Sequence, residues 1–410
     1  MSDRRLFLSF RPLQASPDAR RLFGGFFISW FGRQMLVVAV PFQIYSVTRS
    51  SLMVGLLGLF QFVPLLLASL GGGAAADAWD RRRLLRAAQA GMLITAALLL
   101  GNSLLSAPLL WPLYVMTAIN AALQAFDSPA RAAALPRIIG RELLAEGVAL
   151  FQTVGNLAKA GGPILAGAII GFASLTAAYG AAVGAFVLSF LLVSTLSPIP
   201  APDSPPRPGL RSIREGFTFV RGRPFLKANF GIDLNAMIFG MPSALFPAFA
   251  LEVLPGGDAT TVGLLYAAPG VGALIAALLS GWVRNVRRQG RAVVYAVIVW
   301  GAAIAGFGLS RNIPLALALL AVAGAADVLS AIFRVTILQL TVPDELRGRL
   351  FGMNVAVVAG GPRLGDLEAG LVASIAGPVF SVVSGGVACI VGALVIAKRV
   401  PEYTRTVITA

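Results

Sequence analysis

The sequence contains no histidine and a single cysteine, Cys389, which lies within an apolar run. One cysteine cannot form a disulfide within the chain, and without histidine the usual Cys/His zinc site cannot be assembled. A histidine-based catalytic triad and a histidine proton shuttle are excluded for the same reason. The composition therefore predicts no metal site, and any proton carrier in this protein must be a carboxylate.

Charged residues are also scarce, at 12% of the chain, while 57% of the residues are hydrophobic and the mean hydropathy is +0.82. A soluble domain carries about a quarter charged residues, because it needs a hydrated surface. The low fraction over 410 residues leaves too little polar surface for a soluble globule, so lipid must solvate much of the exterior. The 45 glycines suit membrane helices that pack closely.

Apolar runs long enough to cross a bilayer, which takes about 20 residues each, recur along the whole chain. Tight turns such as Ser106–Pro108 and Asn312–Pro314 separate several of them. The sequence therefore predicts an all-α membrane protein with twelve transmembrane helices. The predicted spans lie near residues 22–47, 52–76, 84–106, 108–131, 147–170, 174–197, 225–251, 260–283, 292–310, 312–334, 349–372 and 376–397.

The net charge of +15 comes from basic residues that gather at alternate ends of the predicted spans. If the N-terminus is cytoplasmic, the external turns contain only Arg49 and Arg311. Because arginine and lysine in short loops stay on the cytoplasmic side, both termini are predicted to be cytoplasmic. A nucleic-acid partner would require a basic face with stacking aromatic residues, and none is expected.

A proline- and arginine-rich stretch, residues 198–223, divides the predicted spans into six and six. The sequence Val-Gly-Leu-Leu at 54–57 recurs across it at 262–265, in each case opening a span that ends in a basic loop. Parallel repeats of this kind place a transport site near the bilayer midplane between two halves. The predicted organisation, in a monomer, is an N-terminal six-helix bundle (1–197), a cytoplasmic linker (198–223) and a C-terminal six-helix bundle (224–410).

A short motif lies between the second and third predicted spans. Gly73 is followed four residues later by Asp77 and then by a basic cluster that includes Arg81 and Arg82. Glycine permits close helix approach, and the aspartate can accept bonds from a neighbouring helix N-terminus. The motif resembles the loop signature of the major facilitator superfamily, although Asp80 stands where that family usually has a second glycine.

Further stretches extend the resemblance over essentially the whole chain. Residues 126–131 (FDSPAR) close span four, Gly162, Pro163 and Gly167 lie in span five, and a glycine precedes Asp366 in span eleven. This set resembles the bacterial enterobactin-exporter branch of the superfamily, whose relatives include macrolide and multidrug efflux proteins. The resemblance implies export driven by the proton gradient without a cofactor. It does not fix the substrate, because these branches share their motifs; a siderophore or related metabolite is the substrate that we expect. The span-five glycines and proline are interpreted as helix-packing and bending positions.

Charged residues inside membrane spans are costly, and each is therefore a candidate for transport work. Arg33 and Lys159 would suit an acidic or catecholate substrate, with an internal ion pair as the alternative for each. Asp366 is the favoured proton carrier. The other candidates for substrate binding or proton coupling are Asp233, Asp327, Arg363 and Glu368.

Two arginines at corresponding positions, Arg131 and Arg334, close the fourth span of each predicted half. Asp127 precedes Arg131 by four residues, the spacing of an ion pair along a helix, and we favour a structural or gating role for this pair. Asp327 precedes Arg334 by seven residues and shares its helix face. For Asp327 and Arg334 an ion pair through a neighbouring helix and a direct role in transport are both left open.

Other functions are also compatible with these patterns. A broad-specificity drug exporter would share the same motifs, and a lipid flippase would share the spans. No glycine-rich phosphate loop ending in Lys-Ser or Lys-Thr occurs, so an ATP-driven pump would need a separate subunit. We therefore expect a multi-pass transporter of the bacterial cytoplasmic membrane that is not an enzyme and whose partners are a small-molecule substrate and the lipid bilayer.

Overall fold

A computed structural model describes residues 9–200 and 218–407 of the chain, except for the side chains of 70–78, 344–345, 347–349 and 351. All regular elements within those residues are helical, which confirms the all-α prediction. In this described part, nine helices are long and apolar enough to cross a membrane. The count of twelve spans and the cytoplasmic termini stay predictions.

The chain divides into two compact units. The first comprises Met1–Val40 and Val63–Arg207, and the second comprises Pro41–Phe62 and Pro208–Ala410. Residues 41–62 thus group with the second unit, whereas the sequence had suggested a single division at the linker. The predicted bundle limits stay predictions.

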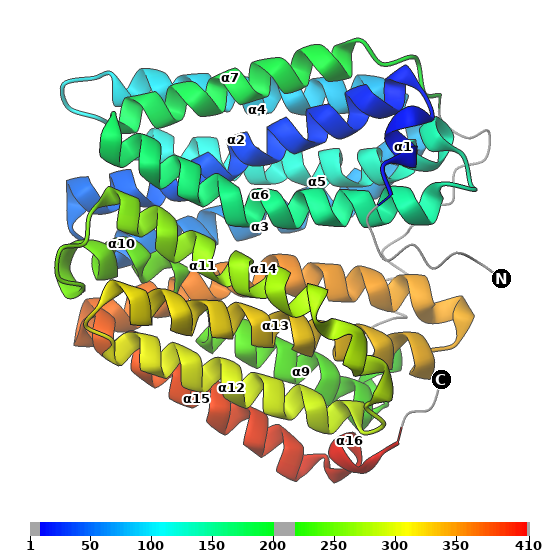
Figure 1. The fold of residues 1–410 in the computed structure, drawn as a ribbon, viewed down its shortest axis with the longest axis vertical. Helices are drawn as coiled ribbons and strands as arrows, with labels where there is room; N and C mark the ends of the chain where they lie inside the picture. Colours follow the sequence, from blue (N-terminus) through cyan, green and yellow to red (C-terminus); the bar gives the residue numbers. More distant parts are fainter. Residues whose placement is uncertain (1–8, 201–217, 408–410) are drawn as a thin grey trace. The chain divides into compact units, whose positions relative to one another are not determined.

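The helices of the first unit run roughly alongside one another (Figure 1). Helix α4 packs against both α5 and α7, and α6 packs against α7. Helices α2 and α3 each belong to both units, because the division falls within them. The helices whose residues enter this unit are α1 (Arg11–Gln14), α2 (Pro17–Thr48), α3 (Ser51–Ala78), α4 (Arg81–Ser103), α5 (Trp111–Ile139), α6 (Leu144–Phe172) and α7 (Leu175–Ser194).

In the second unit, α12 packs between α13 and α15, while α9 lies against α14 and α15. The seventh span predicted along the chain is interrupted here, since α9 is followed by three short helical pieces before α11 begins. The elements are α9 (Pro224–Phe239), η1 (Ser243–Leu245), α10 (Phe246–Ala248), η2 (Phe249–Val253), α11 (Ala259–Leu278), η3 (Ser280–Asn285), α12 (Gln289–Leu309), α13 (Ile313–Thr341), α14 (Asp344–Ala376), α15 (Pro378–Arg399) and α16 (Pro401–Arg405).

Several helix starts follow directly from local sequence. Ser174 accepts a hydrogen bond from the Ala177 N–H at 3.0 Å and caps α7, while Asp258 and Thr261 form a reciprocal capping box at α11. Asn312 caps α13 in the same way. These caps satisfy N–H groups that a helix leaves unpaired, so the turn residues read from the sequence set the helix boundaries.

Close packing in the second unit depends on glycines where α3 meets α14. A Cβ added to Gly55 would lie 2.5 Å from the Asp366 carbonyl oxygen, and one added to Gly58 would meet the Arg363 carbonyl oxygen. On α14, a Cβ on Gly370 would lie 3.0 Å from the Gly55 Cα. Only glycine allows the two backbones to approach this closely, as is common between membrane helices.

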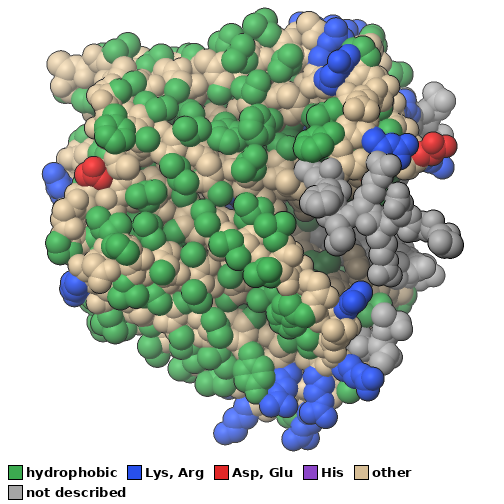
Figure 2. Space-filling view, in the orientation of Figure 1, with side chains coloured by type: hydrophobic (Ala, Val, Ile, Leu, Met, Phe, Trp, Pro, Cys, Tyr) green, Lys and Arg blue, Asp and Glu red, His purple; other side chains and the backbone are tan. Residues whose placement is uncertain are grey.

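The surface is consistent with a lipid environment. Large apolar side chains are exposed along the helices, for example Leu67, Ile94 and Phe172, with exposed fractions of 64%, 59% and 88%. Figure 2 shows hydrophobic side chains spread over the flanks of the helices, while Lys and Arg gather mainly at helix ends. A soluble protein does not carry apolar exposure on this scale.

Candidate functional site

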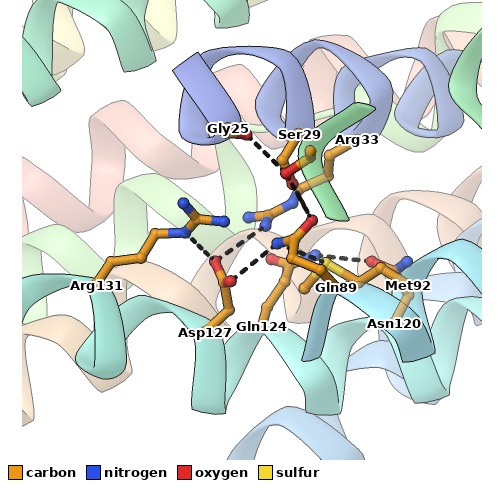
Figure 3. Close-up of polar contacts among 10 residues, drawn as sticks. Gly25, Ser29, Arg33, Gln89, Met92, Asn120, Gln124, Asp127 and Arg131 are labelled. Carbon is orange, nitrogen blue, oxygen red and sulfur yellow. Dashed lines mark hydrogen bonds and ion pairs between the residues drawn. The ribbon is translucent and has the colours of Figure 1, made fainter. Parts of the chain in front are cut away.

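A buried carboxylate, Asp127 on α5, is the centre of a polar network in the first unit (Figure 3). Its Oδ2 lies 2.7 Å from Arg131 Nε and 4.0 Å from Arg33 Nη2, and its Oδ1 accepts a hydrogen bond from Gln89 Nε2 at 2.9 Å. The side chains of Asp127 and Arg131 are each 4% exposed. Burial of the carboxylate is tolerable because two cations and an amide compensate it.

Gln89 on α4 extends this network to two more helices, and sequence reasoning missed it. Its Oε1 accepts a hydrogen bond from Ser29 on α2 at 3.1 Å, and Ser189 on α7 lies 3.0 Å from the same oxygen. Ser189 also lies 2.8 Å from the Gly25 carbonyl oxygen. The available signal was a glutamine within an apolar run, because such a polar group needs internal partners.

Arg33 and Lys159 both lie close to one aromatic ring, that of Trp30. The Arg33 guanidinium carbon lies 5.7 Å from the centroid of the Trp30 ring, and Lys159 Nζ lies 5.8 Å from it. Trp30 and Arg33 are half-buried, and Lys159 is exposed. Arg33 also contacts Asp127 at 4.0 Å, so part of its charge is compensated. The two cations and the indole together present a surface suited to an aromatic anion.

The glycines of α6 bring it close to α2 at this point. A Cβ on Gly155 would lie 3.3 Å from the Trp30 ring, and one on Gly162 would lie 2.5 Å from Gln34 Cβ. Pro163 follows inside the helix, and Gly167 is buried one turn later. These contacts are of the helix-packing kind expected from the sequence.

The basic motif after α3 is placed differently from the sequence expectation. Helix α3 runs to Ala78 and α4 begins at Arg81, so most of the motif is helical and only Trp79 and Asp80 form the turn. Gly73 and Asp77 belong to α3, but their side chains lie outside the described ones. Asp80, the departure from the family pattern, caps α4 by accepting from the Arg83 N–H at 2.9 Å.

The arginines of this motif bind the chain that leaves α7. Arg82 Nη2 donates to the Ser194 carbonyl at 2.7 Å, and Arg81 donates to the Pro200 carbonyl. The Asp80 carboxylate also accepts from the Ile199 N–H at 3.0 Å. Cationic donors satisfy carbonyl groups that the helix end leaves unpaired, so the motif fastens α4 to the end of α7.

The second unit contains a buried ion pair between different helices. Asp233 on α9 contacts Arg334 on α13, and their side chains are 2% and 3% exposed. Asp327 lies near enough to Asp233 to act on it electrostatically. The sequence left open an ion pair with a neighbouring helix and a direct role in transport for Arg334. The structure shows an ion pair between helices, in which Asp233 is the partner of Arg334.

A short C-terminal helix, α16, reaches this pair through Asn229. The Tyr403 phenol donates to Asn229 Oδ1 at 2.9 Å, and Asn229 Nδ2 lies 3.5 Å from the Arg334 carbonyl oxygen. Burial raises the pKa of Tyr403, so the phenol stays protonated and donates. Because Asn229 precedes Asp233 by one helical turn, α16 fixes the part of α9 that carries the carboxylate.

The two units compensate their matching arginines by different routes. The guanidinium carbon of Arg131 lies 5.5 Å from the centroid of the Phe26 ring, and Arg131 forms its ion pair with Asp127 on the same helix. The spacing prediction for Asp127 and Arg131 is thus matched by a local pair.

On α14, the three predicted candidates have separate surroundings. Asp366 Oδ1 accepts from Ser243 Oγ at 2.5 Å and from the Ala244 N–H at 2.9 Å. Arg363 donates to the Ala359 carbonyl on its own helix, and Glu368 is half-buried. Asp366 is therefore bonded across to η1, whereas the sequence had left open a pair within α14.

Residues 9–408 match the family model described as transmembrane secretion effector. The chain belongs to this family. Its members are transporters of the major facilitator superfamily, and the structural neighbours agree with that fold. The protein is therefore a multi-pass protein of the bacterial cytoplasmic membrane.

Sequence relatives cover nearly all of this chain. It is 29% identical to the enterobactin exporter EntS of Citrobacter koseri (strain ATCC BAA-895) over 408 residues, covering 99% of this chain and 97% of the relative. It is 28% identical to the EntS of Shigella dysenteriae serotype 1 over 389 residues, covering 94% and 92%.

Solved structures at low identity share the fold. A peptide transporter POT in complex with sulfate superposes with a TM-score of 0.73 at 12% identity, covering 95% of each chain. The nucleoside transporter NupG superposes with a TM-score of 0.69 at 13% identity, covering 94% of this chain and 98% of that one. At such identities the likeness concerns the fold alone.

Proposed function

We propose that this transporter exports a siderophore or a related acidic metabolite from the cytoplasm, with protons moving in the opposite direction. The observation that carries the proposal is the pair of cations, Arg33 and Lys159, that lie 5.7 Å and 5.8 Å from the centroid of the Trp30 ring. A catecholate presents an aromatic face and negative charge together, which matches this arrangement. The relatives named enterobactin exporters support the same class of cargo.

Proton coupling requires a carboxylate, since the chain has no histidine. Asp366 and Asp233 are the proposed carriers. Each is held by donors from another helix, Asp366 by η1 and Asp233 by Arg334. A change in those donors during transport alters the affinity of the carboxylate for a proton, which couples the gradient to movement of the substrate. Asp327, Arg363 and Glu368 stay secondary candidates.

The test uses the full chain, purified and reconstituted into vesicles with an imposed proton gradient, inside acidic. We expect accumulation of a catecholate siderophore that collapses when the gradient is dissipated. Asp366→Asn and Asp233→Asn should each lose gradient-driven accumulation while still binding the siderophore. If both variants kept full coupling, the carrier assignment would be wrong.

The same vesicles distinguish siderophore export from the two alternative functions, drug export and lipid transfer. A macrolide added in excess should leave siderophore uptake unchanged, because the cationic site disfavours lipophilic cations. Competition by the macrolide, together with transport of the macrolide itself, would instead establish a broad drug exporter. Transport of a labelled phospholipid between leaflets would establish a flippase.

A further inference from the structure

The seventh predicted span of the chain, which lies in the second unit, is broken in its middle. Helix α9 ends at Phe239, and after Gly240 and Pro242 the chain continues as η1, α10 and η2 to Val253. Proline has no N–H and cannot continue the hydrogen-bond ladder of the helix before it. Residues 243–253 therefore form a helical segment that is separate from α9. We term this segment the distal half of span seven.

Side chains from other helices satisfy the backbone at this break. Trp300 on α12 donates its indole N–H to the Gly240 carbonyl at 2.8 Å, and Tyr266 on α11 donates its phenol to the Ser243 carbonyl at 2.9 Å. Trp300 is 2% exposed. Unpaired backbone groups in an apolar interior are costly. These two hydrogen bonds therefore stabilise the break by satisfying carbonyl groups that have lost their helical partners.

The beginning of the distal half is bound by one carboxylate oxygen. Asp366 Oδ1 accepts from both the Ser243 hydroxyl at 2.5 Å and the Ala244 N–H at 2.9 Å. Hydrogen bonds to an ionised acceptor are about twice as strong as neutral ones. The attachment of the distal half to α14 therefore depends on the ionisation of Asp366.

Few other charges or titratable groups face this carboxylate. Arg363, one turn earlier on α14, acts on it electrostatically but donates to the Ala359 carbonyl. Tyr266 contributes a phenol from α11. From α3 the neighbours are Gly55 and Gly58, which carry no charge, and η1 contributes the two donors already described. Glu368 follows two residues later on α14 and is half-buried.

The far end of the distal half is attached through Glu252. Arg49 Nη1 lies 3.8 Å from Glu252 Oε1, with side-chain exposures of 63% and 44%. Exposed ion pairs of this length contribute about 0–1 kcal/mol. Tyr45 is also a hydrogen-bond partner of Glu252. Between its two ends the distal half packs on apolar side chains, since Phe246 and Phe249 are 4% and 0% exposed and both lie against the Phe307 ring. The bonds to Asp366 add a charge-assisted attachment at its beginning.

We propose that Ser243 is a positioning residue through which the distal half of span seven responds to protonation of Asp366. While the carboxylate is ionised, Ser243 and the Ala244 N–H hold the distal half against α14. When Asp366 takes up a proton, the charge-assisted bonds weaken and the distal half swings about the break. The inference rests on the proposed proton-coupled export, and it assigns the moving element of that cycle.

The test measures access to the distal half with a thiol probe. Cys389→Ala removes the one native cysteine, and Val253→Cys places a single thiol on the distal half. The rate of modification by a maleimide is measured in the purified full chain as pH is lowered. A second protein with Ser106→Cys, in a turn of the first unit, corrects for the ionisation of the thiol itself.

We expect the corrected rate of modification to rise about tenfold as Asp366 becomes protonated. This is the factor that corresponds to the free energy of one hydrogen bond to a charged group. Asp366→Asn should give the high rate at every pH. Ser243→Ala should raise the rate at alkaline pH, and Ser243→Thr, which keeps the hydroxyl, should restore the native value. Ser384→Ala, which removes a half-buried hydroxyl bonded within α15, should behave as the parent protein.

The proposal would be overturned if Ser243→Ala reacted like Ser384→Ala, or if Asp366→Asn kept the pH dependence. Neither measurement requires a substrate or a gradient. A pH-dependent probe rate in a protein that moves no siderophore would refute the proposed cargo and leave the hinge intact. Siderophore transport with a pH-independent probe rate would refute the hinge alone.

Discussion

Asp233 on α9 forms a buried ion pair with Arg334 on α13. The matching arginine of the first unit, Arg131, is instead compensated by Asp127 from its own helix. A buried arginine requires a carboxylate partner, because an uncompensated charge in an apolar interior costs several kcal/mol. Both units thus have a buried arginine, but the carboxylate lies on the same helix in the first unit and on a different helix in the second. Movement of α9 relative to α13 would separate Asp233 from Arg334, whereas Asp127 and Arg131 move together on α5.

The Asp127 network should be a major source of stability in the first unit. Asp127→Ala leaves Arg131 and Arg33 without their shared carboxylate, and we expect a loss of about 3–5 kcal/mol in the free energy of unfolding. Thermal unfolding in detergent would measure it. The control is Glu146→Ala, whose partner Arg11 is 63% exposed, with an expected loss of about 1 kcal/mol or less. Equal losses in both variants would contradict the network.

Lys159 should contribute to substrate affinity more than to folding. Lys159→Met removes a cation that contacts the Trp30 ring, and we expect the KM for a catecholate siderophore to rise about tenfold. Lys159→Arg keeps the charge and should remain near the parent value. Lys227→Met removes an exposed lysine at the start of α9 and serves as the control. An unchanged KM in Lys159→Met would exclude this residue from the binding site.

Tyr403 should stabilise the second unit through its hydroxyl and its ring. Tyr403→Phe loses the bond to Asn229 and should cost about 1 kcal/mol. Tyr403→Ala also leaves a cavity beside Phe225, whose ring centroid lies 5.3 Å away, and should cost about 3–5 kcal/mol. Tyr295→Phe, at an exposed tyrosine on α12, is the matched control. The prediction fails if both Phe variants unfold at the same temperature as the parent.

A side chain at Gly58 should destabilise the protein, because α3 and α14 approach closely at this position. Gly58→Ala would press a methyl group against the Arg363 carbonyl, and overpacking of this kind costs about 1–3 kcal/mol. Gly184→Ala, in the middle of α7, meets nothing within 4 Å and should be neutral or slightly stabilising. Thermal unfolding of the two variants distinguishes a packing effect from a general response to alanine; a stable Gly58→Ala protein would contradict the observed approach.

Local features of the sequence predicted a large part of this protein. Low charge and long apolar runs indicated membrane helices, and the turn predicted at Asn312 is where the structure shows a helix cap. The four-residue spacing of Asp127 and Arg131 indicated their pair, because both lie on one helix. The motif at Asp80 was recognised correctly, but its placement in a loop was wrong, since α3 and α4 extend to within two residues of each other.

The sequence by itself determined the helical membrane class, the family and the scarce charges available for transport, because these depend on composition and on spacing within one helix. Tertiary structure alone decided that Arg334 takes Asp233 as its partner, that Gln89 joins the Asp127 network, and that Asp366 holds η1. Each of these contacts joins residues far apart in the chain. Their geometry depends on how helices pack, which helical periodicity does not encode.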